Sequence, residues 1–328
     1  MNEVYHIPAM LQETIEGLNI KPDGVYVDVT FGGGGHSRAI LDRMHALETG
    51  DLKLENGHLY SFDQDEDALQ NAIDDERWTF VHSNFRYLRN WMDYYGIEQI
   101  DGLLADLGVS FHHFDCPERG FSFRFSAPLD MRMNQTAKRR AADVVNSYSE
   151  EELAQLFWLY GELKNGRGIA RNICKARAQR RIERTEELVE NLTPTLSSRE
   201  GGIHILENGE IEVPAQYKKD LAKLFQALRI EVNGEMKALS EMLKGAVEVL
   251  KPGGRLVVLS YHSLEDRLVK NIIRSGNVEG DVEKDIFGRT ETPLRAVGKG
   301  VSTPDEEEIA RNPRSRSAKL RVAEKVES

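Results

Sequence analysis

Short apolar runs alternate with helical patterns along the N-terminal third of the sequence, and this rhythm restricts the possible folds more than any other feature. The apolar runs predict four short strands, at residues 25–29, 58–62, 78–82 and 100–107. Helices are predicted between them, at residues 37–47, 65–71 and 85–95. Strands and helices that alternate in this way form a parallel sheet with helices on both faces. We therefore expect an open α/β domain.

This rhythm stops near residue 110 and returns near residue 217. The intervening segment has helical patterns and no strand-like run; the helices are expected at residues 150–160, 166–184 and 186–192. The later elements are one or two helices, a Pro-Gly-Gly turn and two strands, at residues 218–250, 251–254, 255–260 and 317–324. We therefore expect an α/β domain made of residues 1–109 and 217–328, interrupted by a helical domain at residues 110–216.

Composition excludes several classes of protein. The 328 residues are 40% hydrophobic and 30% charged, as in soluble proteins with a packed core. No apolar run is long enough to cross a membrane, and the N-terminus lacks the pattern of a signal peptide. Cys116 and Cys174 have no metal-type spacing, so we expect no disulfide scaffold, no metal site and a cytoplasmic location.

The net charge of −11 is unusual for a protein that binds nucleic acid, but the distribution of charge matters more than its total. Basic residues gather in three segments, at residues 138–140, 164–184 and 311–321. These segments are either solvated surface or contacts to phosphate groups, and charge alone does not decide between the two interpretations.

Four glycines, Gly32–Gly35, lie between the first predicted strand and the first predicted helix. They allow a sharp turn and let a ligand approach the backbone closely. In an open α/β sheet this is the edge at which ligands bind. The run lacks the last glycine of a dinucleotide fingerprint, and it lacks the Lys-Ser or Lys-Thr pair of a P-loop. S-adenosylmethionine has no phosphate, so it fits a loop without these features.

Two aspartates end strands beside this loop. Asp63 follows the second strand, and its carboxylate can accept hydrogen bonds from both hydroxyls of a ribose; the alternative is a helix cap, a role that Asp65 could fill instead. Asp106 ends the fourth strand after an apolar run, where it either caps a loop or faces a ligand, and we favour the ligand. Together the loop and the two acids predict a site for S-adenosylmethionine.

Three other functions remain open at this point. An S-adenosylmethionine enzyme could act on a protein or a small molecule, although the basic segments argue mildly against this. A nicotinamide-dependent oxidoreductase would also use Asp63 for its ribose, but the glycine fingerprint is incomplete. A non-catalytic RNA-binding module would have no need for the intact loop and its two acids.

Longer motifs carry a more specific resemblance. Unusual strings occur almost from end to end, at residues 6–8, 28–36, 106–110, 118–123, 128–133, 185–188, 225–233, 262–267 and 312–321. On these motifs the chain resembles the bacterial 16S rRNA cytosine N4-methyltransferases, the RsmH or MraW family. The resemblance implies a class I methyltransferase fold, Rossmann-like and mostly parallel, with an inserted helical domain that recognises the substrate.

The resemblance also implies an activity and its partners. The enzyme would transfer a methyl group from S-adenosylmethionine to the exocyclic N4 of a cytidine in 16S rRNA of the small ribosomal subunit. A homodimer is left open. The cofactor contacts implied are Gly34, Gly35, His36, Asp63, Phe85 and Asp106. The family's next contact is usually a glutamine, and His113 takes that position here.

A cytosine amino group is a weak nucleophile, because its lone pair is delocalised into the ring. A group that accepts its proton would assist the reaction. Asp106 is the candidate catalytic residue for this role, and the main chain of residues 107–110 is the alternative.

Two further sets of residues are candidates for RNA contact. The basic side chains that could bind phosphates are Arg167, Arg171, Lys175, Arg177, Arg180, Arg181, Arg184, Arg314, Arg316, Lys319 and Arg321. Phe121, Phe123 and Phe125 alternate along the chain. They could receive an unstacked base, but such a row more often packs in a core.

Overall fold

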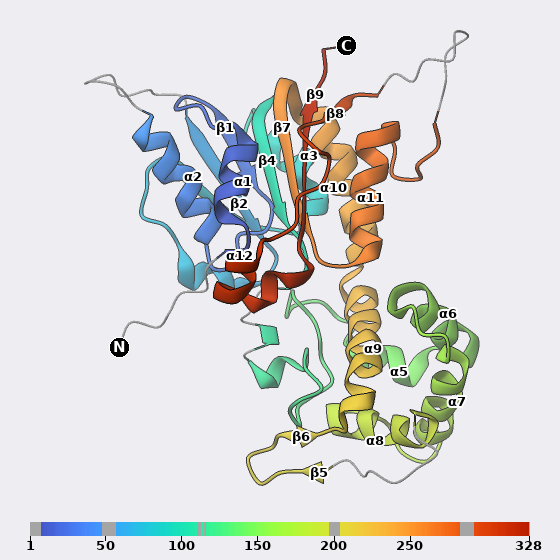
Figure 1. Ribbon diagram of the computed structural model, residues 1–328. Helices are drawn as coiled ribbons and strands as arrows, with labels where there is room; N and C mark the ends of the chain where they lie inside the picture. Colours follow the sequence, from blue (N-terminus) through green and yellow to red (C-terminus); the bar gives the residue numbers. More distant parts are fainter. Residues whose placement is uncertain are drawn as a thin grey trace. The chain divides into compact units, whose positions relative to one another are not determined.

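The protein was analysed as a computed structural model, which describes residues 8–47, 57–109, 113–114, 116–196, 204–282 and 292–327. The chain divides into two compact units (Figure 1). We call the first, Met1–Gly108 with Met236–Ser328, the sheet unit. We call the second, Val109–Glu235, the helical unit. Among the helices described, none is long and apolar enough to span a membrane.

A seven-stranded sheet forms the centre of the sheet unit, in the order β3-β2-β1-β4-β7-β9-β8. Its strands are β1 Val25–Asp28, β2 His58–Asp63, β3 Trp78–His82, β4 Ile100–Asp106, β7 Leu250–Ser260, β8 Leu294–Ala296 and β9 Lys319–Lys325. The first five strands in the spatial order are parallel, and β9 runs antiparallel to both of its neighbours. The mostly parallel α/β sheet expected from the sequence is therefore confirmed.

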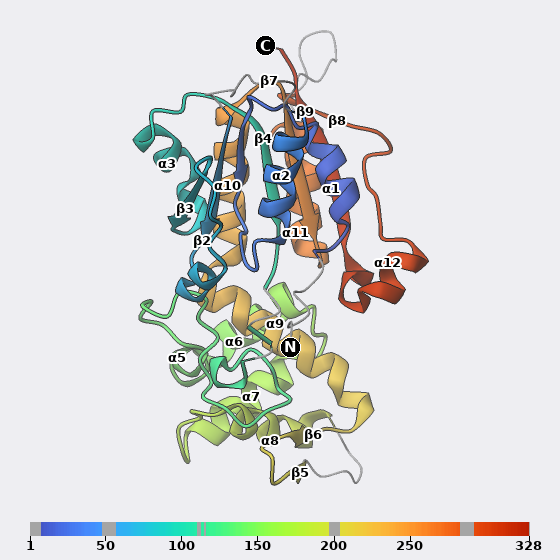
Figure 2. The same cartoon turned by 90° about the vertical axis from the view of Figure 1, so that its left-hand side faces the viewer.

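Helices cover both faces of this sheet (Figure 2). One face carries α1 Leu11–Leu18 and α2 Gly35–Ala46, and the other carries α3 Leu88–Tyr94, α10 Glu235–Val249 and α11 Ser263–Ser275. Side chains alternate along a strand, so Leu103 packs on the α10 side while Leu104 packs on the α1 side. Shorter elements complete the unit: η1 Glu66–Asn71, η2 Phe85–Tyr87, α12 Glu306–Arg311 and η4 Pro313–Ser317.

The helical unit has a core of its own. Its elements are η3 Pro117–Arg119, α5 Ala141–Ser147, α6 Glu150–Gly161, α7 Gly166–Arg177, α8 Thr185–Leu196, α9 Ala215–Asn233 and the strands β5 His204–Ile205 and β6 Ile211–Glu212. Gly166 lies where α7 meets α6, and a Cβ there would approach the Ala154 carbonyl oxygen to 3.2 Å. The short β5–β6 hairpin corrects the expectation that this part of the sequence contains no strand.

Two boundaries differ from those expected. The basic helix was expected to reach Arg184, but α7 ends at Arg177, because Arg184 pairs with Pro128 in a β-bridge and the chain must turn to reach it. The α/β domain was expected to resume at residue 217. In the structure α9 groups with the helical unit, because its apolar face, including Leu224 and Leu228, packs in that unit's core.

Candidate active site

The glycine loop connects β1 to α2 along a strongly bent path. Gly32 and Gly34 have φ angles of 50° and 74°, a region that other residues adopt only with strain. A Cβ on Gly35 would lie 2.3 Å from Cγ of Pro8, so no larger residue fits there. Gly33 is exposed, and a Cβ built on it would have no heavy atom within 4 Å. The loop thus presents open backbone at this point.

Buried polar groups of the neighbouring strands and of α2 stabilise this loop. Asp28 is fully buried; it accepts hydrogen bonds from the Thr30 backbone N–H at 3.0 Å and from the Ser37 hydroxyl at 2.6 Å. Ser37 in turn lies 2.8 Å from the hydroxyl of Ser61, which accepts from the Trp78 indole N–H at 2.9 Å. Burial raises the pKa of Asp28 above its ordinary value, and the hydrogen bond from Ser37 partly offsets that increase.

Asp63 joins the loop to the end of β2. Its Oδ2 accepts from the Gly32 N–H at 2.9 Å, and its Oδ1 accepts from the Asp65 N–H at 2.9 Å. A carboxylate oxygen can accept more than one hydrogen bond, so each oxygen can also accept from a ligand hydroxyl. Asp65 caps η1 by accepting from the Asp67 N–H at 3.2 Å, which confirms its interpretation as the helix cap.

Asp106 joins the same loop to the end of β4. Its backbone N–H donates to the Thr30 hydroxyl at 2.7 Å, and its Oδ1 accepts from the Tyr261 hydroxyl at 2.7 Å. Its Oδ2 lies 3.7 Å from Nδ1 of His36, whose Nε2 lies 3.2 Å from the Ala9 carbonyl oxygen. A carbonyl oxygen only accepts hydrogen bonds, so Nε2 of His36 carries a hydrogen.

The Asp106 carboxyl group is enclosed but reachable, since its side chain is 24% exposed. Burial raises the pKa of Asp106 above its ordinary value, while His36 and the hydrogen bond from Tyr261 act in the opposite direction. The pKa of Tyr261 is also raised, by burial and by the negative charge of Asp106, so this hydroxyl stays protonated and donates. The Tyr261 hydroxyl thus holds the Asp106 carboxyl group in place.

One edge of the sheet therefore gathers most of the residues predicted from sequence. Gly34 ends the loop that contacts both Asp63 and Asp106, and Gly35 and His36 begin α2 directly after it. The reason is topological, since β1 lies between β2 and β4 and all three run parallel. Phe85 follows β3 by three residues, and the start of this segment is joined to the end of β2, because the Ser83 N–H donates to the Asp63 carbonyl oxygen at 2.9 Å.

His113, by contrast, belongs to the helical unit. Its ring is buried and packs against Phe121, with ring centroids 4.6 Å apart. Phe123 packs against Phe225 in the same core, so the core interpretation of the phenylalanine row holds for Phe121 and Phe123. Contact between His113 and a cofactor stays a prediction.

The basic residues around α7 are less available for RNA than the sequence suggested. Four arginines pair with glutamates of the same unit: Arg171 with Glu150, Arg180 with Glu187, Arg181 with Glu183 and Arg184 with Glu186. Arg177 donates to the Val145 carbonyl oxygen at 2.7 Å. Arg167 and Lys175 are exposed and have no acidic partner among the described residues, so they are the better candidates for phosphate contact.

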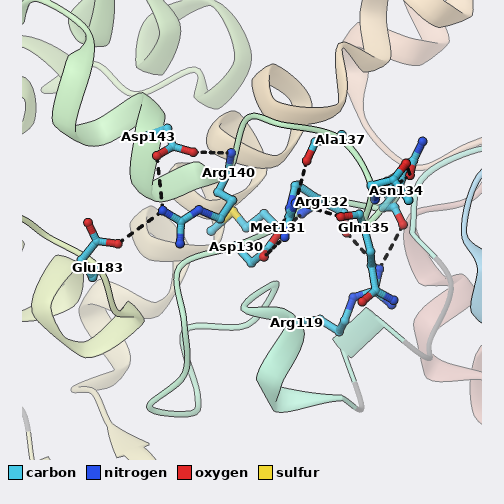
Figure 3. A network of polar contacts seen from close by, with 12 residues as sticks. Arg119, Asp130, Met131, Arg132, Asn134, Gln135, Ala137, Arg140, Asp143 and Glu183 are labelled. Carbon is cyan, nitrogen blue, oxygen red and sulfur yellow. Dashed lines mark hydrogen bonds and ion pairs between the residues drawn. The ribbon is translucent and has the colours of Figure 1, made fainter.

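A motif at residues 128–133 forms a hydrogen-bonded turn of the helical unit. Arg132 donates to both carboxylate oxygens of Asp130, each at 2.7 Å, and to the carbonyl oxygens of Gln135 and Ala137 (Figure 3). Met131, buried between Asp130 and Arg132, has a φ angle of 62°. This network of hydrogen bonds stabilises the strained backbone at Met131.

Sequence reasoning missed Thr30 and Tyr261. Thr30 lies inside the glycine loop motif, and its role as the acceptor for Asp106 could have been suspected from its position two residues after Asp28. Tyr261 follows β7, whose residue Leu259 pairs with Asp106 in the parallel ladder. Only the strand order reveals this neighbour, because Tyr261 and Asp106 are 155 positions apart in the chain.

The charges of this edge discriminate between ligands. Asp28, Asp63 and Asp106 all adjoin the loop, and the nearby Arg38 guanidinium is bound to the carbonyl oxygens of Gly33 and Asn71, at 2.7 and 2.8 Å. Carboxylates repel a pyrophosphate group and attract a cation. These carboxylates therefore fit a nucleoside that bears a sulfonium ion better than they fit a dinucleotide.

Comparison with known proteins agrees with this geometry. The sequence model of the protein family described as "MraW methylase family" matches residues 3–326. Three relatives, each named ribosomal RNA small subunit methyltransferase H, come from Phocaeicola vulgatus, Bacteroides thetaiotaomicron and Flavobacterium johnsoniae, with 56%, 58% and 51% identity. The alignments cover 98% of this chain in each case, and 98%, 97% and 98% of the respective relatives.

The expected class I methyltransferase fold is confirmed as well, since the strand order with its one reversed strand is that of this fold. A family match over nearly the whole chain, and relatives more than half identical over almost their full length, leave no doubt about the assignment. The chain belongs to the MraW methylase family.

Proposed function

We propose that this protein uses S-adenosylmethionine to methylate ribosomal RNA of the small subunit, and that its target is the exocyclic N4 of a cytidine in 16S rRNA, C1402. The observation that carries the proposal is the glycine loop, which binds Asp63 through Gly32 and Asp106 through Thr30. The names of the relatives support the choice of RNA.

The residues present would hold the cofactor in the following way. Gly34 and Gly35 keep side chains away from the loop, and Asp63 accepts from the ribose hydroxyls. His36 and Phe85 flank the same edge, and His113 is a further proposed contact. S-adenosylmethionine supplies, when bound, a methyl group attached to a positively charged sulfur, and the acids of this edge favour such a cation.

Asp106 would act on the amino group of the target base. Its Oδ2 accepts a hydrogen bond from the amino group, which concentrates the lone pair on nitrogen, and it then takes the proton that the nitrogen loses on methylation. The Tyr261 hydroxyl keeps the carboxylate oriented by binding Oδ1. The target base must leave its stack to reach this group.

The remaining parts of the proposal concern partners and location. We propose that the helical unit recognises the RNA, that the protein acts in the cytoplasm and that an assembled particle is the substrate. A particle suits the net charge of −11, because proteins or magnesium ions can offset repulsion from RNA. A homodimer is compatible with this scheme.

Incubation of unmethylated small subunits with labelled S-adenosylmethionine tests the proposal. Label should appear on N4 of a single cytidine. Calorimetry should show binding of S-adenosylhomocysteine and none of NAD. Label on protein, or on another RNA position, would contradict the assigned target, while binding of NAD alone would contradict the assigned cofactor.

A further inference from the structure

A pocket in the sheet unit shares Tyr261 with the Asp106 site. Its volume is about 300 Å³, within the range of ligand-binding pockets, which is roughly 300–1,000 Å³. It is lined by Tyr261, His262, Ser263, Thr303, Arg316, Ser317, Ala318 and Lys319, all of which belong to the sheet unit. The lining thus combines two cationic side chains with three aliphatic hydroxyl groups.

The fold keeps the walls of this pocket rigid. Ser315 is fully buried, and its hydroxyl donates to the Asn312 carbonyl oxygen at 2.7 Å. The Ala318 N–H donates to the Ser315 carbonyl oxygen at 2.7 Å, which closes the turn that carries Arg316. A second tie is the β-bridge between Ser302 and Leu320, which holds the segment before Thr303 against β9. Arg316 therefore projects from a fixed turn rather than from a loose loop.

The positive charges of Arg316 and Lys319 are not fully balanced by carboxylates among the described residues. Arg316 is exposed, and within the described part of the chain its guanidinium has no hydrogen-bond or ion-pair partner. Lys319 is 44% exposed and lies 3.4 Å from Asp266, a carboxylate that Arg321 already binds at 2.8 Å. One carboxylate is thus shared by two cations, and Arg316 adds a further positive charge.

The contacts of each basic residue in this region show whether its charge is already bound within the protein. Arg321 is 13% exposed; besides Asp266 it binds the Gly300 carbonyl oxygen at 3.0 Å, so it belongs to the framework. Three carboxylates lie near Tyr261, and each has partners: Asp106 accepts from the Tyr261 hydroxyl, Glu308 pairs with Arg311, and Glu265 accepts from the backbone N–H groups of Tyr261 and His262, at 2.9 and 3.3 Å. The charge of Arg316 has no such partner among the described residues, so the pocket favours an anion.

We infer that this pocket binds a phosphodiester group of the RNA strand, next to the nucleotide that is methylated. The inference rests on the proposed function. Tyr261 contributes to the pocket lining while its hydroxyl binds Asp106, so a phosphate in this pocket would sit beside the proposed proton acceptor. Phosphate contacts fix the register of a nucleic acid strand, and this one would hold the target base at a constant offset from Asp106.

The test compares Arg316→Gln with Arg43→Gln in the full-length protein. Arg43 is a matched control, because it is exposed on α2 and has no partner among the residues described. Methyl transfer to unmethylated small subunits and direct binding of those subunits are measured over a series of salt concentrations. S-adenosylhomocysteine affinity is measured by calorimetry for each variant.

For Arg316→Gln we expect KM and Kd for the subunit to rise about tenfold, the effect of one lost charge-assisted hydrogen bond. The slope of log Kd against log salt should fall by about one, the effect of one phosphate contact. The affinity for S-adenosylhomocysteine should stay unchanged. Arg43→Gln should behave as the wild type in every measurement.

Three results would overturn the inference. One is an Arg316→Gln variant with the subunit affinity and salt slope of the wild type. Another is a loss of S-adenosylhomocysteine affinity, which would make the pocket part of the cofactor site. The third concerns inorganic phosphate: if it stabilises the wild type but not Arg316→Gln against heat while subunit affinity is the same for both, the pocket takes free phosphate.

Failure of the proposed function would look different. A wild-type protein that transfers no methyl group to these subunits would contradict the reaction. The direct binding measurements would still decide whether Arg316 contacts RNA.

Discussion

At the scale of single residues, the chemistry depends on how Asp106 is held. Three groups outside its own strand fix it: the Thr30 hydroxyl accepts from its backbone, the Tyr261 hydroxyl donates to its Oδ1, and His36 lies near its Oδ2. Burial raises the pKa of Asp106, which makes it a better proton acceptor than an exposed aspartate. His36 and the hydrogen bond from Tyr261 act against this increase in the pKa of Asp106.

Replacement of this carboxylate should separate chemistry from folding. We expect Asp106→Asn to lower kcat by about 10²-fold or more, because an amide cannot take the proton of the amino group. The midpoint of thermal unfolding should change little, since the amide oxygen can still accept from Tyr261. A variant with near-normal kcat would remove Asp106 from the proton transfer and leave the main chain after β4 as the candidate.

Loss of the Tyr261 hydroxyl should move the pH dependence of the reaction. The hydrogen bond from Tyr261 lowers the pKa of Asp106, so Tyr261→Phe should raise that pKa further. Because Asp106 works only when ionised, the acidic limb of the kcat–pH profile should shift to higher pH. Tyr148→Phe is the matched control, since that hydroxyl donates to Glu231 in the helical unit. An acidic limb that stays in place, or moves to lower pH, would argue against this role.

At the scale of elements, the glycine loop is the part whose conformation most constrains its sequence. Gly32 and Gly34 are needed for their positive φ angles, and Gly35 is needed because Pro8 leaves no room for a Cβ. Gly33 has no positive φ angle, and a Cβ built on it would meet no heavy atom within 4 Å. The four glycines look equivalent in the sequence but serve different purposes in the fold.

Alanine substitutions in the loop should reveal this difference. Gly34→Ala should lower the free energy of unfolding by about 1–2 kcal/mol, because its φ angle of 74° lies in the left-handed region. Gly33→Ala should change it by less than about 0.5 kcal/mol, as at an unconstrained surface position. Urea unfolding at constant pH measures both values. Equal losses in the two variants would contradict the assignment of strain to Gly34.

At the scale of the whole molecule, charge is distributed very unevenly. The chain has a net charge of −11, yet Arg167 and Lys175 on α7 and Arg316 on η4 lack acidic partners among the described residues. Four other arginines, in and just after α7, form ion pairs with glutamates. A strongly basic segment in the sequence is therefore only partly basic once its partners are counted.

Charge reversal on α7 tests whether the helical unit binds RNA. We expect the double variant Arg167→Glu and Lys175→Glu to weaken binding of the small subunit and to flatten its salt dependence, because two phosphate contacts would be lost. Affinity for S-adenosylhomocysteine should be unaffected. The control is the same reversal at Arg171 and Arg180, which already pair with Glu150 and Glu187. If both double variants reduced binding equally, general repulsion rather than specific contact would explain the effect.

Local patterns were enough to predict most of the sheet. The strands β1 to β4 lie within a residue or two of the apolar runs that predicted them, because a buried parallel strand needs a short, continuous apolar segment. Helix α11 was missed, since it begins at a histidine cap, His262, instead of the usual serine, threonine or aspartate. The eight-residue helix α1 was missed because it is too short to show a clear period.

By itself the sequence determined the α/β class, the position of the glycine loop, the two acids at strand ends and the family motifs. These are local features, and each depends on residues close together in the chain. Only the tertiary structure decided which distant residues serve one site. The order of strands places β7 beside β4, and so brings Tyr261 to Asp106 and the Arg316 pocket beside both. Strand order follows from the packing of the whole sheet, which no local pattern encodes.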